Sequence, residues 1–177
     1  PSHARPRRMG AILDHRHAQR AQANDVARRA QQMHREHRPG ATEAMLLTLN
    51  LLGTAQQLAG RPAEARASFE EALATQARIE APDENWTATL HNNLGSVLYD
   101  LRDFAGAARE QRLALETYLR AMPDDRVRIL TARANLSVTL SAAGRCDEAR
   151  VETAEAAALL DSGVDLDPVD RAATTNL

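Results

Sequence analysis

A short pattern recurs three times along this chain at a constant spacing of 42 residues. Leu52-Gly53 returns as Leu94-Gly95 and again as Leu136-Ser137, and no insertion separates the copies. Two alanine positions keep the same register, at Ala65, Ala107 and Ala149 and at Ala72, Ala114 and Ala156. A fixed period of this length is typical of stacked supersecondary units rather than of one closed core. Because such arrays present extended surfaces to partners, the period favours a binding protein.

Composition predicts an all-helical chain. Alanine, which has the highest helix propensity, is abundant, whereas aromatic residues make up only 3% of the chain. The formal net charge is −2, so the molecule as a whole offers no electrostatic attraction for nucleic acid or an anionic membrane. No apolar run approaches the length of a membrane span. We therefore expect neither a nucleic-acid partner nor a membrane partner.

The composition also suggests a compartment and a source. Cys146 is the single cysteine, which excludes an internal disulfide and fits a reducing compartment. No signal peptide is visible, so we expect a cytoplasmic protein. Every basic residue is arginine. We interpret this as codon bias in a GC-rich, bacterial genome, with a functional arginine surface as the alternative.

Apolar residues recur at helical spacing within each copy. In the clearest unit, Leu90, Leu94 and Val97 form one stripe, and Asp83 precedes the stripe as a candidate N-cap. The matching stripes predict first helices near residues 42–58, 84–101 and 125–142. Each first helix leads through a short polar turn, at Gly60, Arg102 or Gly144, into a second helix that runs antiparallel to it.

These helices define the expected domain organisation. We expect residues 1–8 to be a basic terminus that can be disordered and residues 9–40 to be a degenerate first repeat. Three clear repeats follow, at residues 41–82, 83–123 and 124–166. Residues 167–177 begin a further, truncated repeat. We therefore expect that the chain ends inside a new repeat, as a fragment of a longer protein would. Self-association through this truncated repeat is one expected consequence, because its apolar side has no second helix to cover it.

The repeated positions resemble the tetratricopeptide repeat. Leu52-Gly53, Ala65, Phe69 and Ala72 match that motif in one copy. Gln111 and Thr153 stand where the later copies would have the aromatic residue, and Ser137 replaces the glycine of the third. The 42-residue unit and the segment Leu90-His91-Asn92-Asn93-Leu94 are similar to the kinesin light chain version of the repeat. The resemblance implies a right-handed superhelical array, an α-solenoid of antiparallel helix pairs.

One side of the first helices is the candidate binding site. At 100° per residue, Asn92, Asn93 and Ser96 fall opposite the apolar stripe of their helix. The resemblance implies that this side lines a concave groove that holds peptides. The full candidate set is Asn50, Thr54, Gln57, Thr89, Asn92, Asn93, Ser96, Tyr99, Asp100 and Asn135. Asparagine carries a donor and an acceptor and can pair with any peptide backbone, although a solvated polar face remains the alternative.

No other constellation of residues predicts chemistry. The histidines lack supporting metal ligands, so we expect no metal site, and no glycine-rich loop predicts a nucleotide. Cys146 is expected to be a small packed residue, since no histidine arrangement activates it. We expect no catalytic residue and no cofactor.

Two hypotheses for function follow. The first is a non-catalytic scaffold that binds a protein or peptide segment in the concave groove. The alternative is a sensor or regulatory region of a larger bacterial signalling protein, such as a nucleotide-binding regulator, a protease or a transcriptional regulator, with its effector domain outside this sequence.

Overall fold

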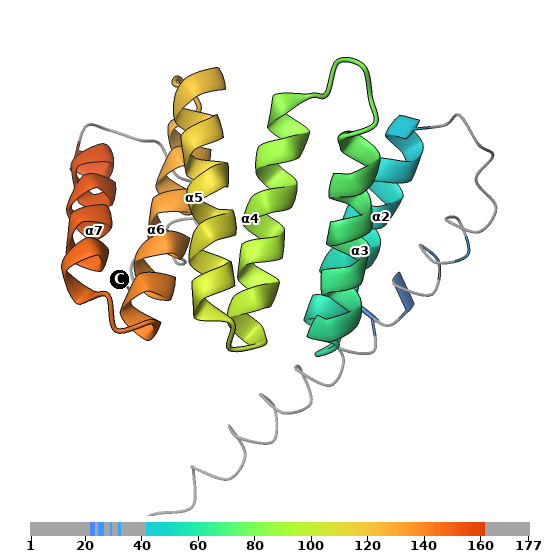
Figure 1. Cartoon of the computed structure of the whole chain (residues 1–177), viewed down its shortest axis with the longest axis horizontal. Coiled ribbons are helices and arrows are strands. Elements are labelled where there is room, and N and C mark those ends of the chain that lie inside the picture. The colour runs from blue at the N-terminus through green and yellow to red at the C-terminus, as the bar shows by residue number, and fades with distance from the viewer. Residues whose placement is uncertain (1–21, 24, 27–28, 30–31, 33–41, 162–177) are drawn as a thin grey trace, which may run out of the picture. The chain divides into compact units, whose positions relative to one another are not determined.

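A computed structural model describes residues 22–23, 25–26, 29, 32 and 42–161. In residues 42–161 it contains helices only: α2 (Thr42–Leu58), α3 (Pro62–Gln76), α4 (Glu84–Asp100), α5 (Phe104–Ala121), α6 (Arg126–Ala142) and α7 (Cys146–Asp161) (Figure 1). The all-α prediction is confirmed, and the three predicted first helices agree with α2, α4 and α6 to within one residue. The expected basic terminus, most of the degenerate first repeat and the truncated last repeat lie outside the described residues.

The chain forms two compact units, residues 1–72 and 73–177. In the first unit, α2 buries Leu46, Leu49 and Leu52, which recur at helical spacing, and Phe69 of α3 is fully buried. Val26 packs against the buried pair Leu52 and Ala55. The predicted apolar stripe is therefore the core of this unit.

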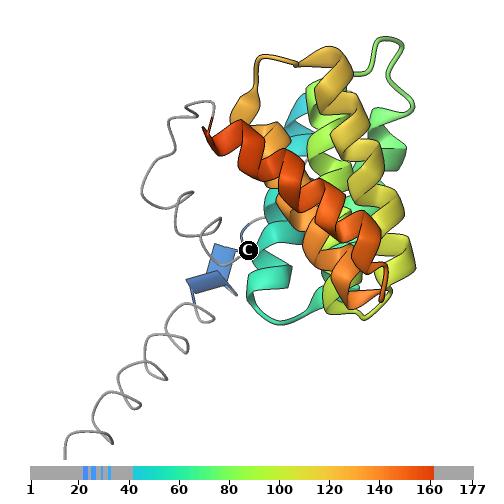
Figure 2. The same cartoon turned by 90° about the vertical axis from the view of Figure 1, so that its left-hand side faces the viewer.

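The second unit contains α4 to α7, and consecutive helices run antiparallel (Figures 1 and 2). Its apolar core includes Leu115 and Tyr118 of α5 together with Ile129, Leu136 and Leu140 of α6. Burial of these side chains is the main stabilising term, at roughly 25 cal/mol for each Å² of apolar surface removed from water. Among the described residues, no helix is long and apolar enough to cross a bilayer.

Aspartates fix the starts of three helices. The Asp83 carboxylate accepts hydrogen bonds from the backbone N–H groups of Asn85 and Trp86 at the start of α4. Asp103 and Asp125 do the same for α5 and α6. An N-cap of this kind satisfies backbone donors that have no partner within the helix. The predicted cap at Asp83 is confirmed.

The three turns between first and second helices share one backbone conformation. Gly60 and Gly144 have φ of +76°, and Arg102, at the matching position, has φ of +65°. The backbone N–H groups of these residues also donate equivalent hydrogen bonds: Gly60 to the Gln57 carbonyl oxygen, Arg102 to that of Tyr99 and Gly144 to that of Ser141. The left-handed region costs a residue with a Cβ atom roughly 1–2 kcal/mol, so Arg102 holds a strained turn that glycine adopts freely.

Each first helix approaches its second helix closely at one small residue. A Cβ atom placed on Gly53 would lie 2.8 Å from the Phe69 ring, and one on Gly95 would lie 2.5 Å from Cγ of Gln111. In the third copy, the Ser137 hydroxyl meets the Thr153 hydroxyl at 2.6 Å. Ser137 also contacts a repeated alanine of the second helix, because its hydroxyl donates to the Ala149 carbonyl oxygen at 3.1 Å.

Replacing Arg102 with glycine should stabilise the protein. The glycine relieves the strained turn, and the loss of the Arg102 guanidinium, 5.9 Å from the Phe104 ring centroid, offsets only part of the gain. We expect the free energy of unfolding, measured by urea denaturation, to rise by about 0.5–1 kcal/mol. Arg102→Ala is the control, because it loses the ring contact and keeps the strain. Equal stability of the two variants would contradict this explanation.

Replacing Gly95 with leucine should destabilise the protein. The side chain would overlap Gln111 and the Ala107 carbonyl oxygen, and such overpacking costs roughly 1–3 kcal/mol. The matched control is Ala105→Leu on the exposed side of α5, which should leave the urea midpoint nearly unchanged. A Gly95→Leu midpoint equal to that of wild type would show that the two helices do not touch here.

Candidate partner-binding face on the first helices

The described structure brings predicted site residues of α4 and α6 together. Asn135 of α6 donates from Nδ2 to Oδ1 of Asn92 on α4, at 3.1 Å. Both side chains are half-buried, and their helices are in direct contact. Part of the predicted asparagine row is therefore a hydrogen bond that ties two first helices together. We call the side of α4 and α6 that carries this pair the amide face; it comprises Thr89, Asn92, Asn93, Ser96, Thr131, Ala134, Asn135 and Val138.

The hydroxyl groups of the amide face use their protons within the fold. Ser96 donates to the Asn92 carbonyl oxygen at 3.2 Å, and Thr131 donates to the Val127 carbonyl oxygen at 2.9 Å. The Thr89 hydroxyl lies 3.3 Å from that of Tyr118 on α5. Hydroxyls that bond back to the preceding turn offer little to a partner. The capacity of this face to bind a partner therefore rests mainly on its amides.

Two further predicted residues lie at the end of α4. Tyr99 is half-buried with its ring 5.4 Å from that of Phe104, so part of its surface belongs to the contact between α4 and α5. Asp100 is the last residue of the helix and is exposed. Sequence reasoning placed both on the binding side and did not foresee the ring contact of Tyr99.

The remaining predicted residues, Asn50, Thr54 and Gln57, lie on α2 in the first unit. All three are half-buried, and Thr54 donates to the Asn50 carbonyl oxygen at 2.9 Å. This bond repeats the pattern of Ser96 and Asn92 one period earlier. On α2, exposed leucines accompany the polar residues, at Leu47, Leu51 and Leu58.

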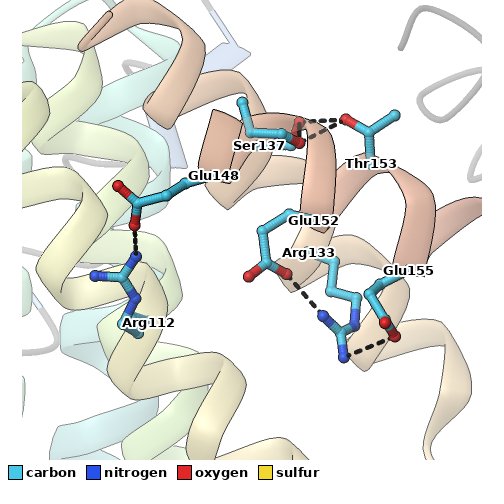
Figure 3. Close-up of polar contacts among 8 residues, drawn as sticks. Arg112, Arg133, Ser137, Glu148, Glu152, Thr153 and Glu155 are labelled. Carbon is cyan, nitrogen blue, oxygen red and sulfur yellow. Dashed lines mark hydrogen bonds and ion pairs between the residues drawn. The ribbon is translucent and has the colours of Figure 1, made fainter. Parts of the chain in front are cut away.

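Close polar pairs join each first helix of the second unit to its second helix. His91 Nδ1 lies 2.7 Å from Glu110 Oε2. One period later, Arg133 Nη1 forms an ion pair with Glu152 Oε2 at 2.7 Å (Figure 3). All four side chains are at most 20% exposed. Sequence reasoning missed these pairs, although the 42-residue spacing of both partners was available as a signal.

A further ion pair links the two second helices of this unit. Arg112 Nη2 of α5 lies 3.0 Å from Glu148 Oε2 of α7 (Figure 3). Glu148 also pairs with Arg145. The hydrogen bond from Arg145 lowers the pKa of Glu148, and Arg112 adds to this effect. Within the second unit, the first helices α4 and α6 are thus linked by Asn92–Asn135, and the second helices α5 and α7 by the exposed Arg112–Glu148 pair, whose contribution to stability is small.

The structure corrects one expectation, the packing of Cys146. Cys146 is exposed at the start of α7, so the predicted packing of this thiol is wrong. Its position at the first helical residue places its side chain beyond the core that Ala149 and Ala156 enter. In the described part of the chain, no group of histidine, cysteine or carboxylate side chains could hold a metal ion.

Comparison with known proteins identifies the repeat. Residues 44–120 match the model of the family described as Tetratricopeptide repeat, which confirms the resemblance predicted from the sequence. No curated protein matches the sequence of the chain. The match covers the repeats that contain Gly53 and Gly95.

Solved structures show the same fold. BtubC (BKLC) from P. vanneervenii is 26% identical with a TM-score of 0.72, over 94% of this chain and 70% of that one. A putative kinesin light chain from Podosopora anserina, with nearly identical TPR-like repeats, is 17% identical with a TM-score of 0.70, over 98% and 84% of the two chains. The apo form of RapI is 14% identical with a TM-score of 0.64, and the match spans 87% of this chain but 40% of that one.

Stability should decrease at alkaline pH because of Tyr118. Burial raises the pKa of this phenol above its ordinary value of 10.0. Above that pH the unfolded chain loses the proton that the folded protein retains, so the free energy of unfolding falls as pH rises toward the folded-state pKa. We expect a smaller decline in Tyr118→Phe, measured by urea denaturation between about pH 9 and 11. Parallel curves for the two proteins would contradict this.

Proposed function

We propose that the amide face binds an extended segment of a partner protein through the backbone of that segment, as a non-catalytic scaffold. The supporting observation is the Asn92–Asn135 pair. Their mutual hydrogen bond holds the two amides side by side. Within the described residues, Nδ2 of Asn92 and Oδ1 of Asn135 make no further hydrogen bond, so one donor and one acceptor remain for a partner.

A peptide backbone matches this arrangement chemically. Every residue other than proline carries one N–H donor and one C=O acceptor, and an extended segment leaves both without an internal partner. Pairing with a donor and an acceptor therefore recognises a protein segment whatever its side chains are. The tetratricopeptide fold supports the same conclusion, since it indicates a protein–protein interaction scaffold.

The other predicted residues are assigned supporting roles in this proposal. Thr89, Asn93, Ser96, Tyr99 and Asp100 of α4 would border the bound segment. On α2, Asn50, Thr54 and Gln57 carry the same classes of side chain and would serve the first unit in the same way. We further propose that, within the second unit, the sides of α4 and α6 that carry the amide face line a concave groove.

Three broader proposals remain from the sequence. A bacterial origin rests on the absence of lysine, and a cytoplasmic location rests on the single cysteine, whose thiol is exposed. Self-association through residues 167–177 rests on their repeat-like sequence alone. The regulatory alternative gains no support from the described residues.

Replacing Asn92 and Asn135 together with alanine should weaken partner binding. The probe is a synthetic peptide selected from a random library with the wild-type chain, and affinity is measured by calorimetric titration. Each lost hydrogen bond is worth roughly 0.5–1.5 kcal/mol, so we expect affinity to fall about 5- to 150-fold. Because the amide pair is uncharged, affinity should depend only weakly on salt.

Glu116→Ala is the control, because Glu116 is an exposed residue of α5, a second helix, and lies outside the amide face. It should bind the peptide as wild type does. Urea denaturation of all three proteins checks that the double variant remains folded. Equal affinity of the double variant and wild type, or failure of the library to yield any binding peptide, would contradict the proposed function.

A further inference from the structure

Val138 is an unusual residue on the amide face. Its side chain is 44% exposed, although it is large and apolar. The matching residues of the earlier repeats are Thr54 and Ser96, whose hydroxyls bond back to their own helices. The third repeat therefore presents an apolar side chain where the other two present an internally satisfied hydroxyl.

The surroundings of Val138 on α6 are small and uncharged. Ala134 precedes it by one helical turn and Ala142 follows by one turn, while Asn135, which pairs with Asn92, lies three residues before it. The charged residue of this side of α6, Arg128, is ten residues away and pairs with Asp125 at 2.7 Å. Arg133 points to the opposite side, where it pairs with Glu152 of α7.

We infer that Val138 determines specificity and that the partner segment places an uncharged aliphatic side chain on it. This inference rests on the proposed function. A backbone held by Asn92 and Asn135 directs side chains onto the neighbouring turn of α6, where Val138 offers apolar surface. An aliphatic side chain gains free energy there by leaving water. A charged side chain would lose hydration without gaining an ionic partner from α6.

The partner is therefore an extended segment with at least one aliphatic residue, which lies on Val138. The formal net charge of the chain, −2, favours neither an acidic nor a strongly basic partner. The amides supply affinity that is independent of side chains, and Val138 supplies the selection among side chains. The two contributions can be separated by experiment, because they depend on different residues.

A positional-scanning array of synthetic peptides tests this inference. The array is probed with the labelled full-length chain and with variants Val138→Glu and Val138→Ala. Wild type should prefer valine, isoleucine or leucine at one peptide position. Val138→Ala should weaken binding of the preferred peptides about 3- to 10-fold, as expected for the loss of apolar contact. Val138→Glu should change the preference at that one position to lysine or arginine.

Val151→Glu is the matched control, because Val151 is 59% exposed on α7, outside the amide face. It should retain the wild-type preference. An Asn92→Ala/Asn135→Ala variant should bind all peptides less well without changing the preferred side chain. An unchanged preference in Val138→Glu, with peptides still bound, would overturn the inference and leave the proposed function standing. If the wild-type chain bound no peptide, both would be overturned.

Discussion

The close approach of the two helices in each repeat is the constraint on which the rest of the structure depends. At this crossing, the size of the first-helix residue is matched to the residue 16 positions later on the second helix. Gly53 accommodates the ring of Phe69, and Gly95 accommodates Gln111. In the third repeat both positions are small and polar, and two hydroxyls meet at 2.6 Å. Because protein interiors are densely packed, a larger residue at one of the two positions requires a smaller residue at the other.

This crossing positions the side chains that we assign to binding. Because the first helices pack closely on their second helices, the His91–Glu110 and Arg133–Glu152 pairs can form at equivalent places in successive repeats. The adjacent residue on α4 is Asn92, which then meets Asn135 of α6. The amide face is thus a consequence of helix packing, and it requires neither a loop nor a ligand to order it.

Much of the fold could be predicted from the sequence, because helix periodicity and turn residues are local signals. Asp83 and Gly144 mark a helix start and a turn without reference to any neighbour. The pairing of Asn135 with Asn92 could not be predicted, because it depends on the rotation and spacing of α4 and α6. The exposure of Cys146 was missed for a similar reason. The apolar positions of α7 predict that Ala149 and Ala156 are buried, as they are. They do not indicate how far the core extends toward the start of the helix, where Cys146 lies.

A double-mutant cycle between Gly95 and Gln111 tests the size matching most directly. Gly95→Ser alone introduces a clash, and Gln111→Thr alone leaves a gap beside Gly95, so each should lower the free energy of unfolding. The double variant installs the Ser137–Thr153 pair of the third repeat and should recover most of that loss. We expect a favourable coupling of about 1–3 kcal/mol from urea denaturation of the four proteins. Additive losses in the double variant would contradict the central role of this crossing.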